Sequence, residues 1–172
     1  STHALFVVPA GGTEVQGWLG RERPDLRVMS VGQSIEIYKE AVDPRDFVER
    51  FGLSDISASH ALGHTRMATE SRVTTEHSHP FSTGLDLCLV HNGSLSNHNR
   101  LRTFLRGQGI SFQTDNDTEV AAGYLTWRLH EVDGMSTPLR ACLTDLDGFY
   151  TFAVGTANGF AVLRDPIACK PA

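Results

Sequence analysis

The chain has 172 residues, of which 40% are hydrophobic and 20% are charged, and its formal net charge is −5. This length suits one folded domain with a substantial core, and the acidic balance excludes the basic surface that nucleic-acid binding requires. No apolar run is long enough to span a bilayer. We therefore expect neither a nucleic-acid nor a membrane partner, and a cytoplasmic location.

Three apolar stretches in the first part of the chain predict short strands. Residues 4–8 and 28–31 are apolar runs that end near proline or glycine, and residues 56–66 alternate between apolar and polar side chains. Because the chain begins directly in such a run, we expect that it is an internal piece of a larger domain.

Four segments predict helices. Asp43 and Pro44 place a capping residue before a proline at the first helical position, and Gly52 ends the helix. Helical spacing of apolar residues recurs in residues 97–106 and 137–146. Between these two helices, Asp115 or Asp117 is expected to cap another helix, supported by Glu119.

Two Asn-Gly pairs follow or join predicted strands. Residues 85–90 are strongly apolar and lead to Asn92-Gly93, which readily forms a tight turn. Asn158-Gly159 joins residues 149–154 and 160–163 in a predicted hairpin. Paired strands with helices grouped between them predict an α+β fold with antiparallel sheets.

Four of these residues could act on an amino acid, and each also has a purely structural interpretation. Arg66 could hold a carboxylate through two hydrogen bonds or form an ordinary ion pair. The Asn92 amide and the Gly93 N–H could form an oxyanion hole, or the pair could be only a turn. Asp117 could receive an α-ammonium group or simply cap a helix.

Metal chemistry has little support in the sequence. Three cysteines at unpatterned spacing argue against a disulfide framework and a cysteine-based zinc site. His77 and His79 stand close together, but no further ligand follows at a recognisable spacing. The dense histidines between residues 60 and 98 are therefore expected to be loop or hydrogen-bonding residues.

An ordered set of motifs makes the chain similar to a known family. The motifs are Gly63-His64-Thr65-Arg66-Met67-Ala68-Thr69, His79-Pro80, His91-Asn92-Gly93-Ser94-Leu95, Asn97-His98, Asp117-Thr118-Glu119-Val120 and Arg164-Asp165-Pro166. Together they resemble the glutaminase domain of class II glutamine amidotransferases, over almost the whole chain. The resemblance implies the N-terminal-nucleophile hydrolase fold, a four-layer αββα sandwich of two antiparallel sheets, here without its first strand and helix.

The resemblance also implies roles for individual residues. Arg66 would bind the α-carboxylate of glutamine and Asp117 its α-amino group, while Thr69 and His79 would line the same pocket. Asn92 and Gly93 would form the oxyanion hole. No metal and no other cofactor is implied.

Further motifs resemble a narrower group. Met67, residues 90–99 and residues 165–171 are similar to glutamate-synthase-related amidotransferase subunits, such as those of N-methylglutamate synthase. This likeness implies glutamine as substrate and synthase subunits of a larger complex as partners.

One expected feature has no counterpart in the sequence. The family begins with a catalytic cysteine followed by Gly-Ile, and nothing here matches that segment. Ser1 aligns with a later strand, and Cys88, Cys142 and Cys169 are not placed as N-terminal thiols. Two hypotheses follow: a glutaminase that is completed by an upstream cysteine, or a glutamine-binding or regulatory subunit that performs no chemistry.

Overall fold

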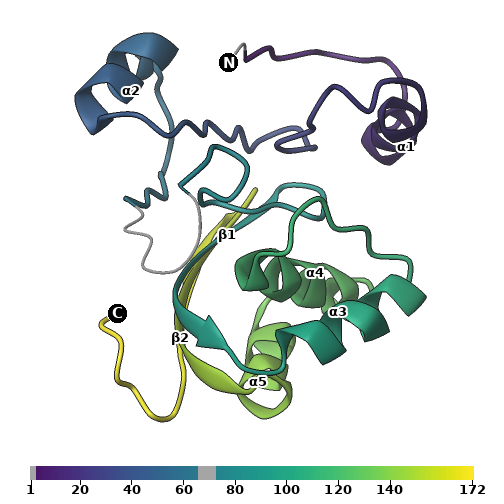
Figure 1. Cartoon of the computed structure of the whole chain (residues 1–172), viewed down its shortest axis with the longest axis vertical. Helices are drawn as coiled ribbons and strands as arrows, with labels where there is room; N and C mark the ends of the chain where they lie inside the picture. Colours follow the sequence, from purple (N-terminus) through teal and green to yellow (C-terminus); the bar gives the residue numbers. More distant parts are fainter. Residues whose placement is uncertain (1–2, 66–72) are drawn as a thin grey trace.

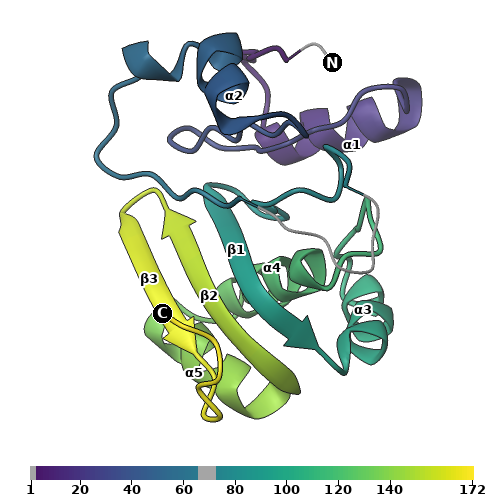
Figure 2. The same ribbon diagram turned by 60° about the vertical axis from the view of Figure 1, so that its left-hand side comes forward.

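The computed structural model describes residues 3–65 and 73–172. The strands of its antiparallel sheet, in spatial order, are β1 (Leu87–Leu95), β2 (Gly148–Thr156) and β3 (Gly159–Arg164). The helices on one face of this sheet are α3 (His98–Gly107), α4 (Asp117–Leu129) and α5 (Ser136–Asp145) (Figure 1). With the sheet turned toward the viewer, these helices lie behind it (Figure 2).

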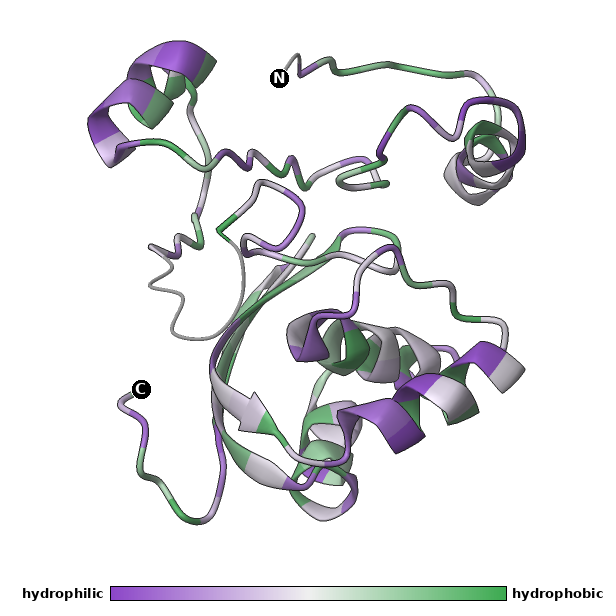
Figure 3. Ribbon diagram, in the orientation of Figure 1, coloured by the Kyte–Doolittle hydropathy of each residue, from purple (hydrophilic) through white to green (hydrophobic). Residues whose placement is uncertain are grey.

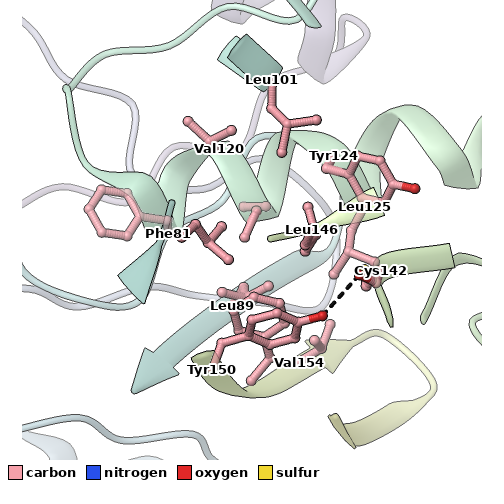
Figure 4. Packing of buried hydrophobic residues seen from close by; sticks show 14 of the residues in the cluster. Phe81, Leu89, Leu101, Val120, Tyr124, Leu125, Cys142, Leu146, Tyr150 and Val154 are labelled. Carbon is pink, nitrogen blue, oxygen red and sulfur yellow. Dashed lines mark hydrogen bonds between the residues drawn. The ribbon is translucent and has the colours of Figure 1, made fainter. Parts of the chain in front are cut away.

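The core lies between the sheet and these helices. Alternate residues of β1 face the helices, and Leu87, Leu89 and Leu95 are each at most 3% exposed. Helix α4 is buried along most of its length and packs against β1 and α3. Figure 4 shows this packing, in which the Tyr150 hydroxyl donates a hydrogen bond of 2.9 Å to the carbonyl of Cys142.

Helix α4 begins differently from the prediction. Asn116 is the cap, since its side chain accepts a hydrogen bond of 2.8 Å from the N–H of Thr118. Asp117 is the first helical residue, and Asp115 lies before the cap. Glu119 accepts hydrogen bonds from the N–H groups of Gln113 and Thr114, whereas the N–H of the cap residue Asn116 donates to the Thr114 hydroxyl. Glu119 therefore holds the loop before the helix and does not form the predicted support of the cap itself.

The N-terminal part of the chain lies beyond one end of the sheet (Figure 2). Its helical elements are α1 (Gly12–Glu22), α2 (Pro44–Phe51) and the 3-10 helix η1 (Leu53–Asp55), and none of their residues is buried. Most of α2 is hydrophilic (Figure 3). The Asp86 carboxylate connects this part to the start of β1 by accepting hydrogen bonds from three consecutive backbone N–H groups, those of residues 33–35.

The predicted helix after Asp43 is confirmed, but the early strands are not. Residues 4–8 are exposed and extended without a paired strand among the described residues, and the described part of residues 56–66 is irregular. Residues 28–31 contribute one isolated bridge, between Val31 and Leu85. An apolar run becomes a strand only where another strand lies beside it to accept its hydrogen bonds.

The predicted α+β class with antiparallel sheet is confirmed. Of the four expected layers, the described residues form a helical layer and one sheet. The C-terminal residues run along the opposite face of that sheet (Figure 1), where the Thr151 hydroxyl reaches the carbonyl of Lys170 at 3.3 Å. No described helix is long and apolar enough to cross a membrane.

Candidate functional site

Four of the six predicted site residues lie in the described part of the chain. Asn92 and Gly93 lie within β1, His79 lies in the loop that runs beside β1, and Asp117 begins α4. Arg66 and Thr69 lie outside the described residues. The four described residues therefore come from three separate segments that meet at β1.

The meeting place is the edge of β1 that faces away from β2, called here the outer edge. Phe81 forms an antiparallel bridge with Leu89 at this edge, through two backbone hydrogen bonds of 2.9 Å. Two residues further along, the N–H of His91 donates to Nδ1 of His79 at 3.3 Å. The N–H of Leu95 donates to Oδ2 of Asp117 at 2.9 Å.

The Gly93 N–H belongs to the same row. In an antiparallel strand, alternate residues direct their N–H groups to opposite edges, so Gly93 points to the outer edge as His91 and Leu95 do. Among the described residues, its N–H makes no hydrogen bond to any group outside the sheet. A backbone donor therefore stands open between two side chains, those of His79 and Asp117.

Asn92 lies on the other face of the sheet from His91. Its side chain is exposed, as is that of Ser94, whereas the helix-facing neighbours His91 and Leu95 are buried. Since β1 lies at the edge of the sheet, the backbone of Asn92 runs along the same outer edge as the Gly93 N–H.

The predicted tight turn at Asn92-Gly93 is wrong, because β1 continues through the pair to Leu95. Gly93 nevertheless has a φ of 143°, which favours glycine. A Cβ at this position would lie 2.0 Å from the carbonyl oxygen of Phe149 on β2. The glycine is required by the close approach of β2 as well as by its own φ.

Asp117 holds its carboxylate at the N-terminus of α4, with the side chain 23% exposed. The partial positive charge of the helix end attracts negatively charged groups such as this carboxylate. One oxygen accepts the Leu95 N–H, and the carboxylate retains further lone pairs for another donor. A ligand ammonium group could therefore bind at the exposed side of Asp117.

His91 approaches the same carboxylate but does not form a charged pair with it. Its Nδ1 lies 3.8 Å from Oδ1 of Asp117. Burial lowers the pKa of His91 to about 4, although the negative charge of Asp117 acts in the opposite direction. At neutral pH His91 is an uncharged imidazole, so Asp117 keeps its negative charge available.

Other histidines join the site. The rings of His64 and His79 lie 4.3 Å apart, which brings the segment before Arg66 to the outer edge of β1. Nε2 of His77 lies 2.9 Å from Asp115. Within the ranges 3–65 and 73–172, no group of three or more potential metal ligands comes together.

A separate, small cavity of about 30 Å³ lies among Lys39, Glu76, Phe81 and Glu119. None of the described site residues lines it. The candidate site is therefore the open edge of β1 and not this cavity.

Sequence comparison identifies the family. Residues 64–172 match the glutamine amidotransferase domain. The chain belongs to this family. One relative is the glutamine amidotransferase-like protein GlxB of Rhizobium meliloti (strain 1021), which is 57% identical over 173 residues that cover 100% of this chain and 58% of that protein. A glutamine--fructose-6-phosphate aminotransferase of Methanosarcina mazei is 33% identical, over 76% of this chain and 23% of its own length.

Solved structures confirm the fold of this glutamine amidotransferase domain. An allosteric regulatory enzyme of purine biosynthesis matches with a TM-score of 0.57 and 31% identity, over 70% of this chain and 27% of its own. The glutamine phosphoribosylpyrophosphate amidotransferase of B. subtilis matches with a TM-score of 0.50 and 31% identity, over 63% of this chain and 23% of its own. Both are class II amidotransferases of the N-terminal-nucleophile hydrolase fold, as the sequence motifs predict.

Two residues of the site were not singled out from the sequence. Thr118 is 1% exposed and His91 is 4% exposed, and both contact His79 directly. The signal for His91 is its position in β1, where a polar side chain occupies a row otherwise filled by leucine and glycine. Thr118 carries no comparable signal, because a threonine in the first turn of a helix is common.

Proposed function

We propose that this domain hydrolyses the side-chain amide of glutamine and supplies the ammonia to a synthase partner. The observation that supports it best is the open Gly93 N–H at the outer edge of β1, beside Asn92 and between His79 and Asp117. This arrangement offers two donors to a developing oxyanion and a carboxylate to an amino group, within one short stretch of surface.

The roles follow from the chemistry of each group. Asn92 and Gly93 stabilise the oxyanion that forms when a thiolate attacks the glutamine carbonyl. Asp117 binds the α-ammonium group. Arg66 binds the α-carboxylate, and Thr69 and His79 complete the wall of the pocket. Ammonia leaves as the thioester forms, and water then releases glutamate and restores the thiol.

The attacking thiol is proposed to be an N-terminal cysteine, whose α-amino group serves as its base. The buried cysteines of this chain are poor substitutes. Burial raises the pKa of Cys142 to about 12 and also raises the pKa of Cys88. Both thiols therefore stay protonated at neutral pH, and thiols react as nucleophiles in the thiolate form.

The test compares two asparagines in the full-length protein. Asn92→Ala should lower kcat for glutamine hydrolysis about 100- to 1000-fold, the usual cost of one lost oxyanion donor. Asn158→Ala is the matched control, because Asn158 precedes the glycine of the other Asn-Gly pair, which also has a positive φ and lies at the exposed β2-β3 turn. It should leave kcat unchanged. Full activity of the Asn92 variant would exclude the oxyanion assignment.

Covalent labelling tests the chemistry itself. A glutamine-like diazoketone should alkylate an N-terminal cysteine, and mass spectrometry of the peptides locates the adduct. Wild-type protein that binds glutamine yet forms no adduct and releases no ammonia would instead be a binding or regulatory subunit.

The synthase partner is proposed to be of the N-methylglutamate synthase or glutamate synthase type, within a multi-subunit complex. The support is the sequence similarity of residues 90–99 and 165–171 to such subunits. Reconstitution of the complex should give glutamine-dependent formation of N-methylglutamate or glutamate. Activity that requires free ammonia and ignores glutamine would contradict this assignment.

A further inference from the structure

A buried polar residue occupies an unexpected place in the core. His91 shares the helix-facing row of β1 with Leu89 and Leu95, and its side chain is 2% exposed. Its Nε2 has no hydrogen-bond partner among the described residues. Burying an unsatisfied polar atom is unfavourable. We therefore expect the other ring nitrogen, Nδ1, to make contacts that offset this cost.

That other atom begins a chain of hydrogen bonds. Nδ1 of His91 lies 3.1 Å from the hydroxyl of Thr118, which in turn lies 3.1 Å from Nε2 of His79. Nδ1 of His79 then accepts the backbone N–H of His91 at 3.3 Å. The three residues close a ring that uses both nitrogens of His79.

The backbone N–H of His91 fixes the direction of the hydrogen bonds among His91, Thr118 and His79. A backbone N–H can only donate, so Nδ1 of His79 is unprotonated and the proton of its neutral ring lies on Nε2. Nε2–H donates to the Thr118 oxygen, and the Thr118 hydroxyl then donates to Nδ1 of His91. With this donor direction, the neutral His91 carries its own proton on Nε2.

Each member of the ring also borders the candidate site. His91 directly precedes Asn92, Thr118 directly follows Asp117, and His79 belongs to the predicted pocket wall. A shift of any member would move the outer edge of β1 relative to the start of α4. Errors of about 1 Å in such a site can cost about 100-fold in rate.

We infer that His91 and Thr118 are positioning residues that hold His79 as the neutral Nε2–H tautomer, and that this ring fixes the spacing between the oxyanion donors and Asp117. The inference rests on the proposed function for its effect on catalysis. The tautomer of His79 is independent of catalysis and can be measured by itself.

The experiment uses the full-length protein and three threonine variants. Thr118→Val keeps the shape of the side chain but removes the hydroxyl, whereas Thr118→Ser keeps the hydroxyl. Thr126→Val is the matched control, since Thr126 lies in the same helix, is 5% exposed and pairs with the Thr83 hydroxyl at 2.8 Å. Long-range proton–nitrogen NMR of labelled histidines reports the tautomer, and steady-state kinetics report kcat and KM for glutamine.

The expected result has two parts. Wild-type His79 should show a neutral ring with its proton on Nε2, and Thr118→Val should convert it to a mixture of tautomers. The same variant should lose about 10- to 100-fold in kcat/KM, whereas Thr118→Ser and Thr126→Val should stay within about threefold of the wild type.

Three results would overturn the inference: a wild-type proton on Nδ1 of His79, an unchanged tautomer in Thr118→Val, or an equal loss of kcat/KM in Thr126→Val. A wild-type protein without glutaminase activity would refute the proposed function instead. The tautomer measurements would then decide the inference by themselves.

Discussion

Replacement of Gly93 by alanine should destabilise the fold more than the same change at Gly159. Both glycines have nearly the same φ, 143° and 146°. The surroundings differ, because a Cβ at Gly93 would lie 2.0 Å from the carbonyl oxygen of Phe149, whereas a Cβ at Gly159 meets nothing within 4 Å. Comparison of the two alanine variants therefore separates backbone strain, which both share, from the steric conflict with β2, which only Gly93→Ala has.

The magnitudes follow from these two terms. An unfavourable φ costs roughly 1 to 3 kcal/mol in either variant, and moving β2 away from a new methyl group costs about 1 to 3 kcal/mol more at Gly93. A typical domain has a free energy of unfolding of about 5 to 15 kcal/mol, so Gly93→Ala should remove a large share of it.

Urea denaturation of the wild type and both variants measures the difference. We expect the midpoint of Gly93→Ala to fall well below that of Gly159→Ala. Free energies of unfolding that agree within about 0.5 kcal/mol would refute the steric argument, because sites without special features already vary by that amount.

Two further predictions concern the charged and titrating groups of the site. Asp117→Ala should raise KM for glutamine about 10- to 100-fold, as expected for one lost hydrogen bond between charged groups. Asp115→Ala is the control and should leave KM unchanged. Equal KM values for the two variants would contradict the role of Asp117. The pKa of His91 is lowered on folding from 6.5 to about 4, so the unfolded chain binds the extra proton first and the free energy of unfolding should decrease as the pH falls from 6.5 to 4. The change in the free energy of unfolding over this pH range is about 3 kcal/mol. In denaturation experiments, the free energy of unfolding of His91→Gln should depend less steeply on pH than that of the wild type. Equal slopes for the two proteins would contradict a buried, neutral imidazole.

The sequence predicted best those elements that depend on local chemistry. The helix after Asp43 begins and ends at its predicted cap and glycine. The predicted β2-β3 hairpin is confirmed, with its turn one residue earlier than Asn158-Gly159, because Gly159 already pairs with Thr156. The same dipeptide at Asn92-Gly93 was predicted as a turn and is instead part of β1. The difference is β2, which pairs with β1 along its whole length from a distant part of the chain.

Elements without a local signal were missed. Helix α1 was not predicted, because its apolar residues Val15, Trp18 and Leu19 span little more than one turn, and none of its residues is buried. Residues 4–8 have a strand-like composition but no described strand to pair with. The ring of His91, Thr118 and His79 joins three segments, and only the folded structure brings them together.

The site residues illustrate the same division. Asn92, Gly93 and Asp117 were chosen by residue type and by their order in the family motifs, and the structure places them around one edge. Which N–H groups of β1 face outward could not be read from the sequence, because that depends on the register with β2.

The outer edge of β1 also bears on solubility. An unpaired strand edge is a template on which another chain can add a strand, and proteins that leave one exposed are prone to aggregate. Here the backbone of Phe81 and the side chains of His79 and Asp117 accept the outward N–H groups of Leu89, His91 and Leu95, on both sides of Gly93. The groups that frame Gly93 for a ligand thus also prevent a foreign strand from pairing with β1.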